Sequence, residues 1–174
     1  MQVILNSKEI SGLLDKIAGD IAASLPEGVK VALVGIRSRG EILAQRLHKL
    51  LQELRGGDVD QGTLDITLYR DDLNHMGHEQ PVVRATEIDF DIDDRLLILV
   101  DDVLSTGRSV RAALDALIDL GRPKAIRLAV LLDRGSRELP INADFVGQVI
   151  EVPGNKTVQV YLQEVDNREE VALE

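Results

Sequence analysis

The stretch LILVDDVLSTGRSV, residues 97–110, decides the fold of this chain. Its apolar first half is typical of a strand buried on both faces of a sheet, and the small residues that follow predict a turn into a helix. Two adjacent carboxylates, Asp101 and Asp102, stand at the end of the predicted strand. A strand, a polar turn and a helix in this order form the repeating unit of α/β proteins with parallel sheets.

The turn between this strand and helix has the composition of a phosphate site. The first N–H groups of a helix are unpaired and attract anions, and the hydroxyls of Ser105, Thr106 and Ser109 add further donors. Gly107 lets the backbone approach a ligand closely. Because carboxylates repel phosphate, the two aspartates suit ribose hydroxyls or a Mg²⁺ ion held partly through water. The alternative for each residue taken singly is a surface turn with an aspartate pair and a helix cap.

Helix and strand periodicities alternate along the rest of the chain. Predicted helices cover about 8–24, with Ser7 as the N-cap, a segment around 43–54, and about 110–121. Predicted strands cover 29–36, 63–69, 95–100 and 125–132. The stretches 55–62 and 71–80 are rich in glycine or polar residues and predict loops. The alternation predicts an α/β fold with a central, mostly parallel sheet flanked by helices.

Polar residues follow three of the predicted strands. In open parallel sheets, ligands bind beyond the carboxyl ends of the strands, so these residues are expected to meet at one site. The three ends carry Arg37-Ser38-Arg39-Gly40, Asp101 to Ser109, and Asp133-Arg134-Gly135. Two arginines on a glycine-flanked turn suit a polyanion. Taken alone, such a basic turn is more often a solvated surface, but its place at the same edge as the phosphate turn favours the binding site.

The composition bounds the class of protein. With 174 residues, 44% of them hydrophobic, a single domain over residues 1–174 is expected. The absence of cysteine excludes disulfides and thiolate metal sites, so a metal must bind oxygen or imidazole. The net charge of −10 disfavours general nucleic-acid binding. Since no apolar run approaches the roughly 20 residues of a membrane span and no signal peptide is recognisable, a soluble cytoplasmic protein is expected.

The stretch 97–110 resembles the binding motif of type I phosphoribosyltransferases for 5-phosphoribosyl-1-pyrophosphate (PRPP), which these enzymes use with Mg²⁺. The resemblance implies that Asp101 and Asp102 contact the ribose hydroxyls and the metal, and that the following loop holds the 5′-phosphate. It also implies that GIRSRG, residues 35–40, is the pyrophosphate loop. Besides the two aspartates, the implied PRPP contacts are Arg37, Ser38, Arg39, Gly40, Val103, Leu104, Ser105, Thr106, Gly107, Arg108 and Ser109.

The segment LYRDDLNHMGHEQPVVR, residues 68–84, resembles the flexible loop of the same family. The resemblance implies a flap over about residues 70–86 that closes over PRPP and excludes water. Arg70 at its base is expected to contact pyrophosphate. His75 and His78 are interpreted as solvent-exposed residues rather than metal ligands, because no third ligand accompanies them. The expected catalytic set is Asp101, Asp102, Arg39 and Arg70.

Three further segments resemble a narrower family, the bifunctional pyrimidine operon regulators that are also uracil phosphoribosyltransferases. These segments are LDITLYRDDL at 64–73, ALDALIDLGRP at 113–123 and LAVLLDRGSRELPINADFVG at 128–147. The resemblance implies uracil and PRPP as substrates, a homo-oligomer, and a small hood over about residues 133–160. It also implies that Asp133 and Arg134 read the edge of the base. A salt-bridged turn is the alternative for that pair.

The match weakens on the surface credited with binding pyrimidine operon leader RNA. Where that family usually reads DRGHRELPIRADFVGKN, this chain has Ser136, Asn142 and Gln148 in place of His, Arg and Lys, while Arg137 is retained as the candidate RNA contact. Losing basic residues weakens RNA binding. Three hypotheses follow: a uracil phosphoribosyltransferase with little or no RNA regulation, an RNA-binding attenuator with nucleotides as effectors, and a phosphoribosyltransferase for purines or another base.

Overall fold

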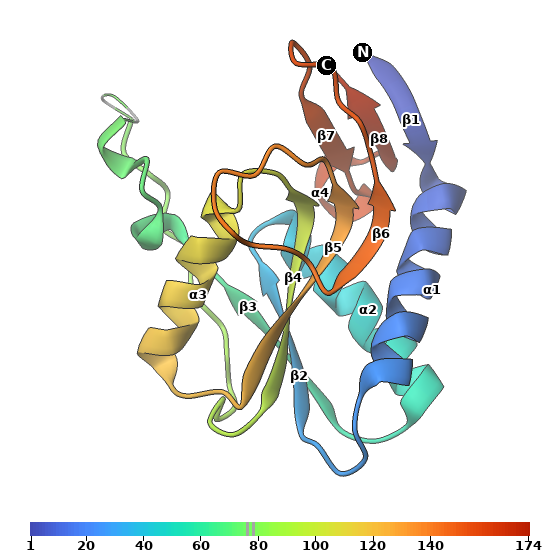
Figure 1. Ribbon diagram of the computed structural model, residues 1–174, viewed down its shortest axis with the longest axis vertical. Coiled ribbons are helices and arrows are strands. Elements are labelled where there is room, and N and C mark those ends of the chain that lie inside the picture. The colour runs from blue at the N-terminus through green and yellow to red at the C-terminus, as the bar shows by residue number, and fades with distance from the viewer. Residues whose placement is uncertain (76, 78) are drawn as a thin grey trace.

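A parallel sheet of five strands forms the centre of the structure (Figure 1). This computed structural model describes residues 1–75, 77 and 79–174. The strands are β2 (Val31–Ile36), β3 (Val59–Leu64), β4 (Leu96–Leu104), β5 (Ala125–Asp133) and β6 (Phe145–Val149). They lie in the order β3-β2-β4-β5-β6, and every neighbouring pair is parallel. The predicted α/β fold class is confirmed.

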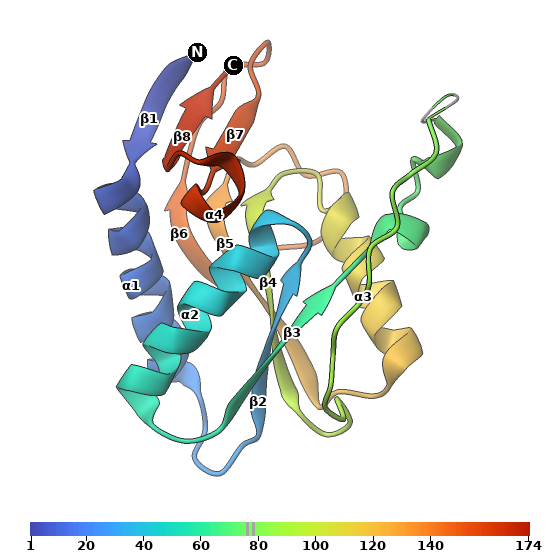
Figure 2. The same ribbon diagram turned by 180° about the vertical axis from the view of Figure 1, so that it is seen from behind.

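Helices cover both faces of this sheet (Figures 1 and 2). They are α1 (Ser7–Ser24), α2 (Arg39–Arg55) and α3 (Arg108–Leu120). Side chains alternate along β2: Val31 and Leu33 pack in the core with α1 and α2, whereas Ala32 and Val34 pack in the core with α3. β2 is therefore buried along its whole length, as its apolar sequence predicts. None of the helices in the described part of the chain combines the length and apolarity that a bilayer crossing demands.

A second, smaller sheet joins the two ends of the chain (top of Figure 1). It contains β1 (Gln2–Asn6), β7 (Val158–Tyr161) and β8 (Glu170–Leu173), and the short helix α4 (Gln163–Asp166) connects the last two. The strands are antiparallel in the order β1-β8-β7. The hood expected over about 133–160 stays a prediction; in that range β6 extends the parallel sheet, whereas the small sheet uses both chain ends. Gln2 pairs with Leu173, a contact that no local pattern reveals.

β3 lies earlier in the chain than predicted. The alternation at 63–69 predicts a strand, but β3 stops two residues into that range and Thr67–Tyr69 forms a 3-10 turn, η1. Most of β3 lies in the stretch 55–62, for which a loop was wrongly predicted. β3 is an edge strand, where polar side chains such as Asp60 and Gln61 remain partly exposed. The Asp65 carboxylate then accepts the N–H of Thr67 (2.7 Å), which turns the chain out of the strand.

The N-cap of α1 is Asn6, not Ser7 as predicted. The Asn6 side-chain oxygen accepts the N–H groups of Lys8 (3.0 Å) and Glu9 (3.1 Å), and the Glu9 carboxylate accepts the N–H of Asn6 (2.8 Å). This reciprocal arrangement is a capping box. The prediction was wrong because Asn6 also ends β1, a strand whose partner lies at the other end of the chain.

We expect Asn6→Ala to lower the free energy of unfolding by about 1 kcal/mol, because it removes the acceptor for two helix N–H groups. Ser7→Ala is the matched control, and it should leave the free energy of unfolding unchanged because the Ser7 side chain is exposed. Urea denaturation followed by far-ultraviolet circular dichroism measures both variants. Equal losses in the two would contradict Asn6 as the N-cap.

Candidate active site

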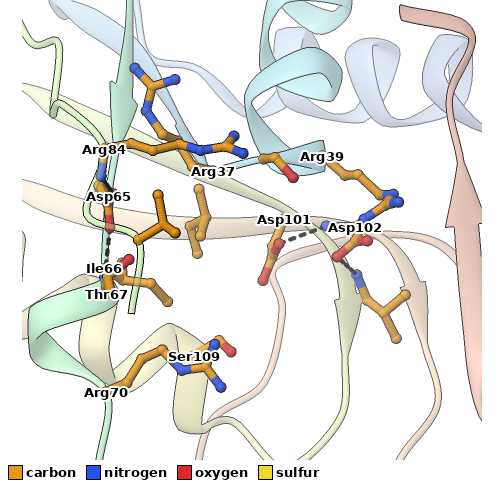
Figure 3. A pocket seen from close by; sticks show the side chains of 14 residues that line it. Arg37, Arg39, Asp65, Ile66, Thr67, Arg70, Arg84, Asp101, Asp102 and Ser109 are labelled. Atoms are coloured by element: carbon orange, nitrogen blue, oxygen red, sulfur yellow. Dashed lines mark hydrogen bonds between the residues drawn. The ribbon is translucent and has the colours of Figure 1, made fainter. Parts of the chain in front are cut away.

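The carboxyl ends of β2, β4 and β5 meet at one edge of the parallel sheet. In the register of the sheet, Gly35 pairs with Val100, which pairs with Ala129. A cavity of about 420 Å³ opens at this edge (Figure 3). Its lining combines the polar ends of β2 and β4 with the segment that follows β3. The lining residues are Ile36, Arg37, Ser38, Arg39, Asp65, Ile66, Thr67, Arg70, Val82, Arg84, Asp101, Asp102, Val103 and Ser109.

Asp101 and Asp102 lie where β4 reaches the cavity. Both are strand residues, since β4 continues past them to Leu104. The Asp101 carboxylate accepts the N–H of Asp102 (2.9 Å), and the Asp102 carboxylate accepts the N–H of Val103 (2.8 Å). Burial, together with the negative charge of Asp102, raises the pKa of Asp101 well above its ordinary value. A ligand that donates hydrogen bonds or carries positive charge would be stabilised here.

Gly40 sets the distance between the arginine turn and these aspartates. A Cβ atom built on Gly40 would lie 2.5 Å from the carbonyl oxygen of Val100 and 3.2 Å from the Cα of Asp101. Only glycine therefore lets the start of α2 pack this closely against the end of β4. As a result, Arg39, the first residue of α2, faces the same cavity as Asp101.

The two arginines of this turn have different partners. Arg37 donates to the carbonyl oxygen of Ala85 (2.8 Å) and to the carboxylate of Glu41 (3.1 Å). Arg39 donates from Nη2 to the Asp166 carboxylate (2.8 Å), and its Nε is buried without a hydrogen-bond partner in the described structure. Because the Arg39 side chain is 28% exposed and that of Arg37 is 16% exposed, Arg39 can offer more N–H donors to an anion than Arg37 can.

The phosphate turn predicted from the sequence leads directly into α3. Gly107 has a φ of 92°, in the left-handed region that favours glycine, and is the N-cap of the helix. The Thr106 hydroxyl accepts the N–H of Arg108 (3.3 Å). A second hollow of about 220 Å³ lies beside the turn, and Ser109 lines both hollows. Helix N–H groups and hydroxyls converge here in a way that suits a phosphate.

Leu104 and Ser105 do not line either hollow. The Leu104 side chain is buried in the core with α3, since strand alternation turns it inward. Its carbonyl accepts the N–H of Arg134 (3.0 Å), and the Ser105 carbonyl accepts Nη1 of Arg137 (3.0 Å). The side chain of Leu104 therefore supports the turn from the core, and the predicted contact of this residue with PRPP, which stays a prediction, would have to come from its backbone.

The segment between β3 and β4 contributes Arg70, which lies with Ser109 across the cavity from Arg39 (Figure 3). Arg70 donates to the Asp72 carboxylate (2.9 Å), and Arg108 donates to Asp71 (2.6 Å). Beyond these contacts a second 3-10 turn, η2 (Leu73–His75), extends away from both sheets beside α3 (Figure 1). His78 lies outside the described residues. Within the described ranges, no three His, Cys, Asp or Glu side chains gather as a metal site.

Asp133 and Arg137 form an ion pair at the end of β5. Two guanidinium nitrogens of Arg137 donate to the two carboxylate oxygens of Asp133 (2.8 and 2.6 Å), and Nε donates to the Ile141 carbonyl (2.7 Å). The hydrogen bonds from Arg137 lower the pKa of Asp133. At Asp133 the structure therefore contains the salt bridge that was the alternative to base recognition. Neither Asp133 nor Arg134 lines the 420 Å³ cavity. The Arg137 guanidinium is directed inward, toward Ser105.

Asp65, Thr67 and Arg84 line the cavity but were not assigned to it from the sequence. The Asp65 carboxylate accepts the backbone N–H groups of both Thr67 and Arg84, so it joins the two ends of the segment that follows β3. Arg84 ends the stretch that resembles a flexible loop. Its positive charge could have marked it in the sequence as a candidate anion contact. Asp65 gave no such signal, because its role depends on where β3 ends.

This fold, with arginines and paired aspartates around one cavity at the strand ends, defines the class of the protein as a phosphoribosyltransferase. A family model described as "Phosphoribosyl transferase domain" matches residues 3–164. The chain is 53% identical over 170 residues to the bifunctional protein PyrR of Deinococcus radiodurans, covering 98% of this chain and 92% of that protein. For PyrR of Limosilactobacillus fermentum the identity is 51% over 172 residues, covering 98% and 96%. The chain belongs to the PyrR family of phosphoribosyltransferases, so the resemblance is confirmed.

Solved structures support the same fold at much lower identity. A hypoxanthine phosphoribosyltransferase of Trypanosoma cruzi superimposes with a TM-score of 0.73 at 18% identity, covering 99% of this chain and 95% of that one. One from Staphylococcus aureus gives 0.72 at 18% identity, covering 98% and 90%. At this identity the likeness concerns the fold alone.

We expect Gly40→Ala to lower the free energy of unfolding by about 1–3 kcal/mol, because the added methyl group would overlap the Val100 carbonyl. It should also weaken binding of PRPP by moving Arg39 away from Asp101. Gly12→Ala in α1 is the control, since nothing lies within 4 Å of a Cβ there. Chemical denaturation and calorimetric titration with PRPP measure the two effects. Wild-type values for Gly40→Ala in both would disprove the close-packing argument.

Proposed function

We propose that this protein transfers the phosphoribosyl group of PRPP to uracil and releases pyrophosphate. One observation carries the proposal: a single cavity is lined by Arg39, Asp101, Asp102 and Ser109, from three separate elements. PRPP presents a ribose diol between a phosphate and a pyrophosphate, and this lining offers carboxylates between hydroxyl and arginine donors. Uracil as the acceptor base is supported by the resemblance of the chain to the bifunctional family.

In this proposal each group of residues binds one part of PRPP. The two aspartates of β4 accept hydrogen bonds from the ribose hydroxyls. Thr106, Ser109 and the start of α3 bind the 5′-phosphate. Arg39, supported by Arg37 and Arg70, binds the pyrophosphate and stabilises the negative charge that grows on it as it leaves.

The donor set at the end of β4 fits Mg²⁺. Asp101 and Asp102 offer carboxylate oxygens, which are the ligands that this hard cation prefers. Since the described residues contain no larger cluster of metal ligands, oxygens of the substrate and water would complete the coordination. When bound, Mg²⁺ would neutralise charge on the departing pyrophosphate.

The reaction needs no protein nucleophile. The bond from the anomeric carbon of ribose to pyrophosphate breaks, a bond from that carbon to a uracil nitrogen forms, and the proton of that nitrogen passes to the released pyrophosphate and from there to solvent. The contribution of the protein is positioning and electrostatic stabilisation. The segment that Asp65 joins at both ends would close over the cavity and keep water from the developing positive charge.

An RNA-binding attenuator is the second candidate, because the chain matches bifunctional PyrR proteins over 98% of its length. Two observations disfavour it. Ser136, Asn142 and Gln148 are neutral where the family is usually basic, and the guanidinium of Arg137 donates to Asp133 and to backbone carbonyls. We propose that any RNA binding is weak in this protein.

Replacing the acids of β4 tests the proposed enzyme. We expect Asp101→Asn/Asp102→Asn to lower kcat/KM by about a hundredfold or more, because the ribose and metal contacts lose their charge. Asp15→Asn/Asp20→Asn, on the exposed face of α1, is a control with the same change in net charge and should keep full activity. A PRPP-dependent assay with Mg²⁺ and a panel of uracil, hypoxanthine and guanine measures both. Unchanged turnover in the Asp101→Asn/Asp102→Asn variant would contradict the roles of these two aspartates. Turnover of purines alone by the wild type would instead identify a phosphoribosyltransferase for purines.

Arg137→Ala distinguishes a structural arginine from an RNA contact. We expect it to lower the free energy of unfolding by about 2 kcal/mol, because it leaves Asp133 and partly buried carbonyls without their donor. Arg122→Ala, which removes an exposed arginine, should change stability little. Urea denaturation and filter binding of leader RNA over a salt series measure the two properties. Full stability together with a salt slope lowered by about one unit would identify Arg137 as an RNA contact instead.

A further inference from the structure

An ion pair connects α4, the helix between two strands of the small sheet, to an arginine of the cavity. Asp166, the last residue of α4, accepts a hydrogen bond of 2.8 Å from Nη2 of Arg39, the first residue of α2. These residues lie 127 positions apart in the sequence. Figure 3 shows Arg39 on the same side of the cavity as Asp102. The orientation of Arg39 therefore depends on an element that lies outside the parallel sheet.

Asp166 is held in place independently of Arg39. Its second carboxylate oxygen accepts the N–H of Leu162 (2.8 Å), and its own N–H donates to the Leu162 carbonyl (2.7 Å). Although burial opposes ionisation, the Leu162 N–H and the Arg39 guanidinium lower the pKa of Asp166 below its ordinary value. Asp166 thus presents a fixed negative charge to Arg39 at neutral pH.

A second arginine attaches α4 to the flank of α2. Arg46 donates to both carboxylate oxygens of Glu164 (3.0 and 2.6 Å) and also to Glu169 (2.8 Å). This pairing fixes the short helix on α2 without involving the cavity. Asp166 is 15% exposed, so its contact with Arg39 is partly shielded from solvent. Such shielding strengthens the pair relative to one on the open surface.

We propose that Asp166 is a positioning residue for Arg39, and that it orients the guanidinium for the pyrophosphate group of PRPP. A free arginine beside Asp101 and Asp102 would be attracted to these acids and would block the ribose site. Pairing with Asp166 uses Nη2, while the Arg39 side chain stays 28% exposed, so its remaining accessible N–H groups can reach an anion. Holding the side chain in one orientation also lowers the entropy lost when the ligand binds. This inference rests on the proposed function, because it takes Arg39 as a pyrophosphate contact.

Ligand binding to Asp166→Asn tests the proposal. Calorimetric titrations with magnesium pyrophosphate and with ribose 5-phosphate probe the two halves of the site separately. We expect pyrophosphate to bind about tenfold more weakly to this variant, since a charge-assisted hydrogen bond that orients Arg39 is lost, while ribose 5-phosphate binds as in the wild type. Glu164→Gln is the matched control: it removes an acid of α4 that does not contact Arg39, and Arg46 keeps its pair with Glu169, so α4 should stay on α2 and both ligands should bind as they bind the wild type.

A double-mutant cycle with Arg39→Gln separates positioning from general stability. If Asp166 acts through Arg39, adding Asp166→Asn to Arg39→Gln should cause no further loss of pyrophosphate affinity. Additive losses, or an equal loss of ribose 5-phosphate affinity, would show a merely structural role and overturn the proposal. If Asp166→Asn does not fold, Asp166→Glu replaces it, with the same weakening expected because the carboxylate is displaced by one methylene. Failure of both to fold would likewise assign Asp166 to stability and overturn the proposal.

The wild-type titrations distinguish this inference from the proposed function on which it rests. If the wild type binds neither PRPP nor magnesium pyrophosphate, the proposed function fails. If the wild type binds both and Asp166→Asn binds pyrophosphate equally well, only the positioning role fails.

Discussion

The close contact between Gly40 and the carbonyl oxygen of Val100 is the constraint on which the site depends. Because Gly40 has no side chain, α2 begins directly against the end of β4, with 2.5 Å between the position of a Cβ and that oxygen. The arginine turn and the paired aspartates come from segments more than sixty residues apart in the sequence. This contact brings the arginine turn and the paired aspartates to one cavity. The sequence of either segment alone would not predict that they meet.

Once these groups are close, their charges must be kept from neutralising one another. The cavity is lined by four arginines and three aspartates, a mixture in which internal ion pairs could fill the space that a ligand needs. The structure instead pairs Arg37 with Glu41, Arg39 with Asp166 and Arg70 with Asp72. Each partner lies outside the cavity lining, so the arginines are restrained while Asp101 and Asp102 stay open. An acidic protein of net charge −10 can in this way keep a local site for a polyanion.

Sequence reasoning predicted the centre of the fold because its signals there are local. β2, β4 and β5 each form from an apolar run, and the candidate site residues follow that run directly in the sequence. The strand end and the site residues beyond it could therefore be predicted together. β3 was misplaced because an edge strand tolerates polar residues such as Asp60, which removes the alternation on which the prediction rests. β1 and β8 were missed because they pair across the two ends of the chain, and β7 was missed because it belongs to the same small sheet through β8. Asp65 and Asp166 were missed for the same reason, since each acts on a residue whose position depends on the tertiary structure.

Binding PRPP and binding RNA would depend on different features of this chain. Binding PRPP depends on a few buried or half-buried groups at fixed separations, and those groups are present. Binding RNA depends on exposed cations that face phosphates, and its strength falls as such cations are lost. Here the loop after β5 is neutral at Ser136 and Asn142, and Arg137 is engaged with Asp133. Because no residue of this loop lines the cavity, changes in the charge of its exposed face can occur without altering the chemistry of the cavity.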